Sequence, residues 1–240
     1  AGLQPCNTFA VHYKGPNIKA IYDDGDAIFI ANIGSLLEPL TAQQYKDKSV
    51  EIPSGLFSHS DQTTQAKTVH AQELNAKGIL GRMVDALSSQ PLPFRARAYS
   101  IWGNDKIIAS RTATATLISP HRGVPQLEDY DSLSPDYFHL SGTTDNFFAE
   151  TFAGMLESAL LQTSTMGELL RNDGVADSRI LGSFADTTLA RQLRQVAKVM
   201  TVREDPQVQS ERDVFLVQHG GYDTHQNLDD IVGGLINELD

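Results

Sequence analysis

The longest apolar runs of the chain have the length of β-strands. Residues 27–31 are continuously apolar, and residues 213–218 contain a second such run. Runs of this length are typical of strands that are buried on both faces of a parallel sheet. Residues 95–100 are a third strand candidate, because they follow a break in the chain at Pro91 and Pro93.

Other segments show the spacing of amphipathic helices. In residues 78–87 and 189–202, apolar side chains recur every three or four positions, as expected for a helix with one buried face. A short helix is expected to stop at the turn-forming sequence of residues 23–25. The full set of predicted helices covers residues 18–22, 60–75, 78–87, 147–170 (as one long helix or two), 189–202 and 228 to the end.

The order of these elements is that of an α/β protein. We predict one α/β domain over residues 1–240, with a mostly parallel sheet. Residues 103–145 contain three prolines and several short polar stretches, and we interpret them as an irregular insertion. In open α/β sheets, ligands bind beyond the carboxyl ends of the strands. The segment after Gln218 has such a position and is the first place to look for chemistry.

Composition limits the classes of partner. The chain of 240 residues has a formal net charge of −11. Nucleic acids and anionic membranes attract basic surfaces, so neither is expected as the main partner, whereas a divalent cation is compatible with this charge. No apolar run approaches the roughly 18 residues of a membrane-spanning helix. The single cysteine, Cys6, excludes an intrachain disulfide.

Residues 219–227 contain the sharpest candidate for chemistry. Gly220 and Gly221 let the backbone turn tightly and approach a ligand. Asp223 and His225, two residues apart on a loop, can point into one site, and a carboxylate with an imidazole is a common ligand pair for zinc, iron or manganese. The alternative interpretation is structural: Asp223 caps the following helix, and His225 is a surface residue.

A second candidate lies in the polar loop that precedes residue 60. Ser58, His59 and Asp61 fall at a predicted helix N-terminus, where free N–H groups and the helix dipole favour an anion. A serine nucleophile for phosphoryl or sulfuryl transfer suits that position. The alternative is again structural: Ser58 or Ser60 is the N-cap, and Asp61 is favourable in the first turn.

Three stretches together resemble one known family. They are residues 26–34, residues 56–62 with Gly81-Arg82 downstream, and the Gly-Gly-Tyr-Asp-Thr-His sequence at residues 220–225. Their order and spacing resemble an uncharacterised, largely bacterial family of sulfatase-like proteins in the alkaline phosphatase superfamily (domain of unknown function 1501). Many of its members carry twin-arginine export signals. The Gly-Gly-aromatic-Asp-Thr-His element is the specific part of the resemblance.

The resemblance implies a three-layer α/β/α, alkaline-phosphatase-like fold with a divalent-metal site at the strand ends. Asp223 and His225 match the family's Asp-Thr-His element, which makes them candidate ligands for zinc, calcium, manganese or iron. Ser58 and His59 match its Ser-His element and are candidates for nucleophile, metal ligand or substrate contact. The resemblance also implies export to the periplasm or the cell exterior.

The chain departs from the family in two elements. Such proteins carry a Gly-Gly-x-Asp element after their first strand and an Asp-His-Gly element near the C-terminus, and neither occurs at those places here. We therefore expect this chain to represent the central portion of such a protein. The sheet and the metal site are then incomplete, and further segments or a partner chain complete them.

These observations predict a metal-dependent hydrolase that acts on the phosphate or sulfate ester of a small molecule or glycan. The alternative is a non-catalytic, exported binding or scaffold protein that retains the fold. A fold alone does not fix a function, so the choice depends on the site.

Overall fold

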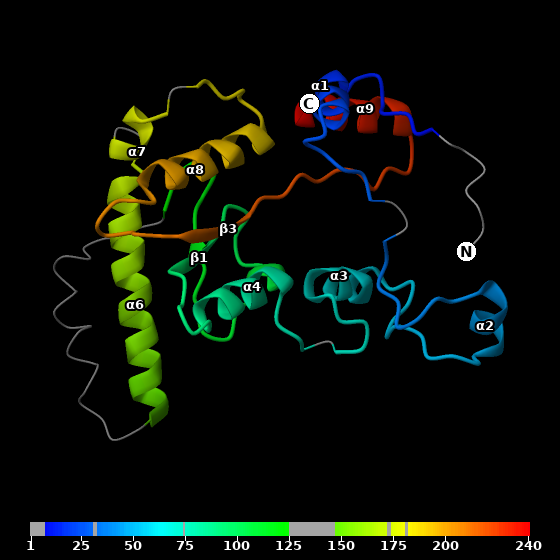
Figure 1. Ribbon diagram of the computed structural model, residues 1–240, viewed down its shortest axis with the longest axis horizontal. Coiled ribbons are helices and arrows are strands. Elements are labelled where there is room, and N and C mark those ends of the chain that lie inside the picture. The colour runs from blue at the N-terminus through cyan, green and yellow to red at the C-terminus, as the bar shows by residue number, and fades with distance from the viewer. Residues whose placement is uncertain (1–7, 31–32, 74, 125–146, 172–173, 181) are drawn as a thin grey trace. The chain divides into compact units, whose positions relative to one another are not determined.

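The chain forms two compact units in the computed structural model (Figure 1). The larger unit covers residues 34–218, and the smaller one joins residues 1–33 to residues 219–240. The structure describes residues 8–30, 33–73, 75–124, 147–171, 174–180 and 182–240. Each unit is described by itself, and the single domain over residues 1–240 stays a prediction.

The larger unit is built around a small parallel sheet. Its strands are β1 (Ala96–Ser100), β2 (Thr116–Leu117) and β3 (Arg212–Leu216), in the order β2-β1-β3. Both pairings are parallel, with Ala98 opposite Val214 in the register of β1 and β3. The predicted α/β class with a parallel sheet is confirmed, as are the two strands expected near residues 95–100 and 213–218.

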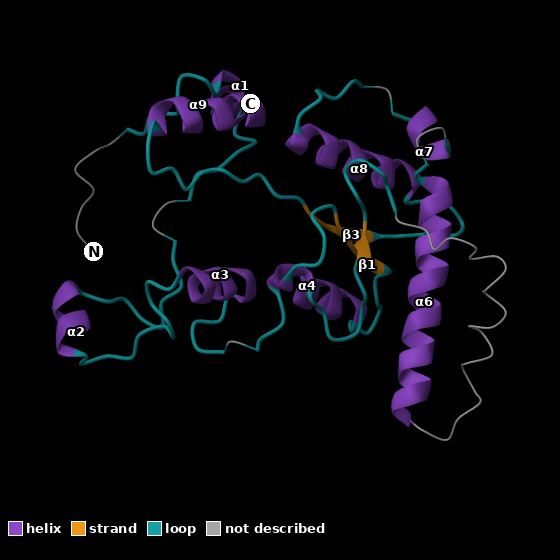
Figure 2. Cartoon of the chain, turned by 180° about the vertical axis from the view of Figure 1, so that it is seen from behind, coloured by secondary structure: helices purple, strands orange, loops and turns teal. Residues whose placement is uncertain are grey.

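Alternate side chains of β1 and β3 face opposite layers of helices, because side chains in a strand alternate between its two faces. Tyr99 and Phe215 stack at 5.4 Å between ring centroids, on the face covered by α6 (Phe147–Leu169) and α8 (Thr188–Val202). The opposite face packs against Val84 of α4 (Ile79–Ser88). Helices thus cover both faces of the sheet, which gives the larger unit three layers (Figure 2).

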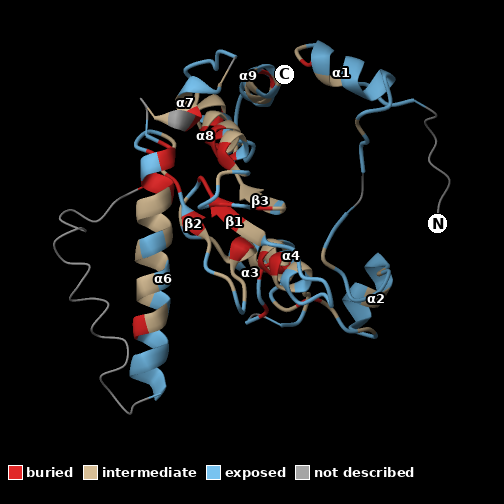
Figure 3. Cartoon of the chain, turned by 60° about the vertical axis from the view of Figure 1, so that its left-hand side comes forward, coloured by how far each residue is buried: buried red, intermediate tan, exposed pale blue. Residues whose placement is uncertain are grey.

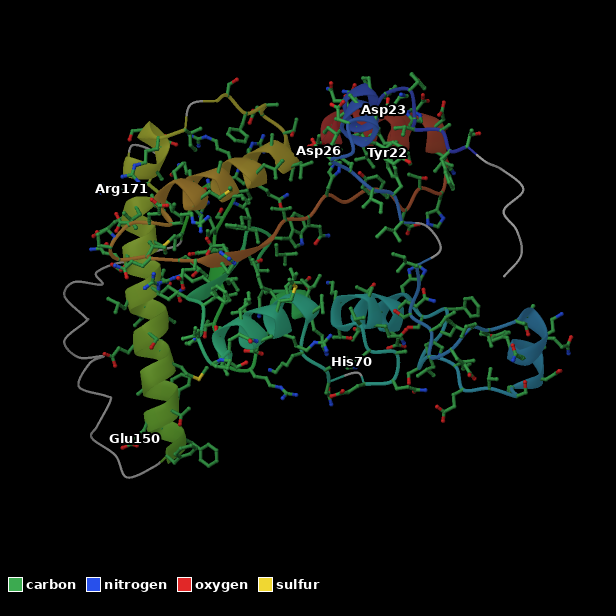
Figure 4. The ribbon with its side chains drawn as sticks, viewed as in Figure 1. Tyr22, Asp23, Asp26, His70, Glu150 and Arg171 are labelled. Carbon is green, nitrogen blue, oxygen red and sulfur yellow. The ribbon has the colours of Figure 1, made fainter. Side chains whose placement is uncertain are left out.

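The buried residues of the larger unit lie around β1, α8 and the end of α6 that is next to α7, and also on α4 (Figure 3). Glu150 and Arg171, labelled in Figure 4, lie near the two ends of α6. The first half of this helix is mostly exposed, and its long predicted span is confirmed as one helix. The helices predicted at residues 78–87 and 189–202 are confirmed as α4 and α8.

Shorter elements complete the larger unit. They are α2 (Ala42–Asp47), α3 (His59–Thr68), the 3-10 helix η1 (Lys106–Ile108) and α7 (Val175–Ser178). The helix α2 was not predicted, although Thr41 and Gln44 carry the signal of a capping box. Thr41 Oγ1 accepts a hydrogen bond from the Gln44 backbone N–H at 3.2 Å, and Gln44 Oε1 accepts one from the Thr41 N–H at 2.9 Å.

The predicted irregular insertion at residues 103–145 is described only as far as residue 124. That part contains η1, the short strand β2 and an antiparallel bridge between Ser119 and Gly123. The strand β2 was missed, because a two-residue strand has no periodic pattern of its own. Residues 125–145 of the predicted insertion lie outside the described residues.

The smaller unit pairs the two ends of the chain. It contains α1 (Pro16–Asp23) and α9 (Leu228–Leu239), both of which were expected from the sequence. Asp240 joins them: its carboxylate accepts hydrogen bonds from the Ile18 N–H at 2.9 Å and from Asn17 Nδ2 at 3.0 Å. These bonds satisfy donors at the first turn of α1, where a helix lacks internal acceptors.

The buried strand predicted at residues 27–31 is wrong for the part that the structure describes. Residues 27–30 form no strand there, and Ile28 and Ile30 are 79% and 68% exposed. Residue 31 lies outside the described residues. An apolar run becomes a strand only when a neighbouring strand pairs with its backbone, and no described strand pairs with this one. Figure 4 labels Tyr22, Asp23 and Asp26 just before it.

Among the described residues, no helix has the length and apolar character needed to cross a lipid bilayer.

Candidate functional site

The chain leaves the carboxyl end of β3 through an anchored residue, Gln218. The side chain of Gln192 on α8 is fully buried and makes two hydrogen bonds to the Gln218 backbone. Its Nε2 donates to the Gln218 carbonyl at 2.7 Å, and its Oε1 accepts from the Gln218 N–H at 2.8 Å. The side-chain amide of Gln192 thus pairs with both the N–H and the carbonyl of Gln218, as the backbone of a neighbouring strand would. The residues that follow form the candidate site in the smaller unit.

Asp223 and His225 lie side by side on a tight turn. The Thr224 N–H donates to the Tyr222 carbonyl at 3.0 Å, which closes a three-residue turn centred on Asp223. As a result Asp223 Oδ1 is 3.6 Å from His225 Nε2. The two side chains are 81% and 86% exposed, so both ligand atoms are accessible. The predicted proximity of this pair is therefore observed.

Gly221 allows the backbone of this loop to turn, because it adopts a positive φ. Its φ of +98° lies in the region that side chains with a Cβ rarely adopt, and a Cβ here would also contact Leu235 at 3.5 Å. Asp223 does not cap α9, contrary to the structural alternative: the N-cap is Asn227, with φ 51° and no side-chain capping bond.

A hydrogen-bonded chain of three side chains fixes the start of the loop. Tyr222 Oη is 2.9 Å from His219 Nδ1, and His219 Nε2 is 3.3 Å from Glu238 Oε2 on α9. The Tyr222 and His219 rings meet edge to face, with centroids 5.4 Å apart. The sequence analysis missed this cluster, because Glu238 lies 19 residues from His219 and no local pattern links them.

The ligand set supplied by Asp223 and His225 is small. Zinc takes four ligands, and calcium takes six to eight. Among the described residues, no group of three or more His, Cys, Asp or Glu side chains gathers as a metal site. The carboxylate and imidazole fit zinc, manganese or iron by donor type, and the pair makes up part of a coordination sphere.

Ser58 is the N-cap of α3, as the structural alternative predicted. Its Oγ accepts a hydrogen bond from the Asp61 N–H at 3.4 Å and lies 3.2 Å from Ser60 Oγ. His59 is the first residue of the helix and is exposed. Activation of a serine requires a neighbouring base. The described contacts of Ser58 Oγ include no imidazole or carboxylate, so its role as a nucleophile stays a prediction.

Arg82, part of the second resembling stretch, is engaged in the fold. Its Nη2 donates to the Thr68 carbonyl at 2.6 Å, and its Nη1 is 2.9 Å from His70 Nε2. These bonds tie α4 to the end of α3. The helix predicted over residues 60–75 ends at Thr68 in the structure, so His70, labelled in Figure 4, lies in the loop after α3.

The four predicted site residues are divided between the units. Asp223 and His225 belong to the smaller unit, whereas Ser58 and His59 belong to the larger one. The structure brings the first two together and leaves the other two adjacent at a helix start.

Comparisons with known proteins found no match to this chain: no family model, no curated protein and no solved structure matches it. The resemblance to the sulfatase-like family therefore stays a prediction from the three sequence stretches.

Proposed function

We propose that this chain belongs to a metal-dependent hydrolase of phosphate or sulfate esters, in which Asp223 and His225 bind the metal. The observation that carries the proposal is the exposed carboxylate–imidazole pair, with 3.6 Å between Oδ1 and Nε2. Two ligands of one cation lie at about this separation, because metal–ligand bonds to N and O are near 2.0–2.2 Å. Along the chain, this turn comes after β3, at residues 222–224.

A divalent metal in such a site activates an oxygen nucleophile and stabilises charge on the transferring group. In this chain the Asp223 carboxylate would supply negative charge and His225 a neutral nitrogen. Ser58 and His59 are proposed as catalytic residues, as nucleophile, metal ligand or substrate contact. Small-molecule or glycan esters as substrates, export from the cytoplasm and membership of the sulfatase-like family are parts of the same proposal, and they rest on the resembling stretches.

The alternative proposal is a non-catalytic binding or scaffold protein with this fold. One observation favours it: the Ser58 hydroxyl accepts the Asp61 N–H as a helix cap, which is a complete structural reason for a serine there. Metal binding distinguishes the proposals less sharply than ester hydrolysis does, because a binding protein can also hold a metal.

The test of the metal site is a calorimetric titration of the chain with zinc and manganese. Because the chain supplies two ligands and water must complete the coordination, we expect weak binding of one ion per chain, and we expect Asp223→Asn and His225→Gln each to weaken it at least about tenfold, because each removes one ligand. Both side chains are mostly exposed, so neither variant should change the melting temperature.

His12→Gln is the matched control in the same unit. His12 Nε2 lies 3.4 Å from Asp229 Oδ1, so it is also an imidazole beside a carboxylate, but outside the predicted loop. Metal binding that is unchanged in Asp223→Asn, or that falls equally in His12→Gln, contradicts the assignment. If the metal site is confirmed, release of p-nitrophenol from its phosphate and sulfate esters distinguishes a hydrolase from a binding protein.

A further inference from the structure

A pocket of about 400 Å³ opens at the amino ends of β1 and β3 in the larger unit. It lies at the end of the strands opposite to Gln218. Three arginines, two glutamates and an aromatic ring are among the groups that line it. They are Phe94, Arg95, Arg203, Glu204, Glu211 and Arg212.

Each guanidinium group in this pocket is held by a backbone carbonyl. Arg95 Nε donates to the Gln209 carbonyl at 2.7 Å. Arg203 Nη2 and Arg212 Nη1 both donate to the Glu211 carbonyl, at 3.2 and 2.8 Å. A guanidinium has five N–H donors, so each retains donors for a ligand after making the bond described. The three groups are thus oriented and still able to bind an acceptor.

Arg212 is also held by an aromatic face. Its guanidinium carbon lies 4.9 Å from the centroid of the Phe94 ring. Such stacking restrains the plane of the guanidinium while its N–H edge stays available. Because Arg212 is largely exposed, this edge can be reached from solvent.

The charges of the pocket favour an anion. Three arginines stand against two glutamates there, whereas the chain as a whole carries −11. Glu211 Oε1 is 3.9 Å from Arg95 Nη2, too long for a hydrogen bond, and Glu211 Oε2 accepts one from the Arg95 backbone N–H at 2.8 Å. Glu211 is thus held beside the pocket without a hydrogen bond to the Arg95 guanidinium.

We propose that this pocket binds a small organic phosphate or sulfate through Arg95, Arg203 and Arg212. Guanidinium groups match the oxygens of phosphate and sulfate, and a tetrahedral dianion accepts hydrogen bonds from several directions, which a pocket lined by three arginines can supply. The volume exceeds that of the anion alone and falls within the range of about 300–1,000 Å³ for small-ligand sites. The site uses none of the proposed metal ligands and does not depend on the proposed hydrolase activity.

The test is a titration of the whole chain with inorganic phosphate, with sulfate and with acetate in the presence of EDTA. Binding is measured by calorimetry and by NMR. We expect saturable binding of one phosphate or sulfate per chain, and weak binding of acetate. Arg212→Gln should weaken binding about tenfold or more, because it removes a charged hydrogen-bond donor. Arg203→Gln should weaken binding to the same extent. If Arg203→Gln unfolds, the Arg212→Gln variant alone tests the site.

Arg111→Gln is the control, because it removes the same charge from an exposed arginine of the same unit that does not line the pocket. A tighter complex with phosphate than with sulfate, or the reverse, identifies the preferred group. No saturable binding, equal binding of acetate, or an equal loss in Arg111→Gln overturns the proposal. Anion binding that needs added zinc and disappears in Asp223→Asn belongs to the proposed metal site and overturns this one as well.

Discussion

Asp85 on α4 should stabilise the chain in a pH-dependent way. Its carboxylate holds the loop before β2 through two hydroxyl groups and two backbone N–H groups. Oδ1 accepts from Ser110 Oγ and Thr112 Oγ1, both at 2.6 Å, and from the Thr112 N–H at 3.1 Å, while Oδ2 accepts from the Arg111 N–H at 2.9 Å. Burial raises the pKa of this carboxyl, but these hydrogen bonds outweigh it and lower the pKa from 3.8 to about 2.

The lowered pKa sets the size and the pH range of the effect. A carboxyl whose pKa falls from 3.8 to about 2 on folding contributes at most about 2.5 kcal/mol at neutral pH. Because Asp85 is partly exposed, we expect about 1–2 kcal/mol after solvent screening. The ionised form is the one stabilised by folding, so the contribution is full above pH 3.8 and is lost as the pH falls through about 2.

The assay is urea unfolding of the wild type and Asp85→Asn at a series of pH values from 7 to 2. The asparagine side chain keeps one oxygen that can accept hydrogen bonds. Its NH2 group replaces the other oxygen and cannot accept the hydrogen bond that this oxygen received. We expect Asp85→Asn to lower the free energy of unfolding by about 1–3 kcal/mol at pH 7. The difference from the wild type should shrink toward pH 2, as the wild-type carboxyl becomes protonated.

Asp47→Asn is the control for general charge effects, because Asp47 is an exposed carboxylate of the same unit that accepts a hydrogen bond from Gln43. A difference between the wild type and Asp85→Asn that is constant from pH 7 to 2 would refute the reasoning. An equal, equally pH-dependent loss in Asp47→Asn would refute it as well.

Five further substitutions test the packing, a buried ion pair and the cap of α3. Gly81→Ala should lower the free energy of unfolding, measured in urea, by at least about 2 kcal/mol, because its Cβ would lie 2.2 Å from a backbone oxygen. Gly154→Ala is the control: its Cβ would meet open space, so it should not destabilise the chain. Asp177→Asn should cost about 1–3 kcal/mol, because it removes the carboxylate charge 3.0 Å from the fully buried Lys198 ammonium, which also donates to the Leu170 carbonyl at 3.3 Å; unchanged stability would contradict that pairing. Ser58→Ala should lower stability by about 1 kcal/mol, whereas Ser58→Asp should keep the cap and the melting temperature. Ester hydrolysis lost in Ser58→Asp at unchanged stability would assign the hydroxyl to catalysis.

Sequence analysis identified the elements whose pattern is local. The helix observed at residues 79–88 was predicted at residues 78–87 from its apolar spacing, and the strand observed at residues 212–216 was predicted at residues 213–218 from its continuous apolar run, because both patterns are displayed by the chain itself. The approach of Asp223 to His225 was also predictable, since two residues separated by one on a tight turn have little freedom to lie apart.

Tertiary structure decided whatever depends on partners far away in the chain. Residues 27–30 have the composition of a buried strand, yet burial needs a paired neighbour that the run cannot specify. Glu238 binds His219 only because α9 returns to the start of the loop. The arginine pocket forms only because β1 and β3, more than 100 residues apart, pair in parallel and bring their amino ends together. Hydrophobic periodicity records which face of an element is buried, and it carries no information about which distant segment covers that face.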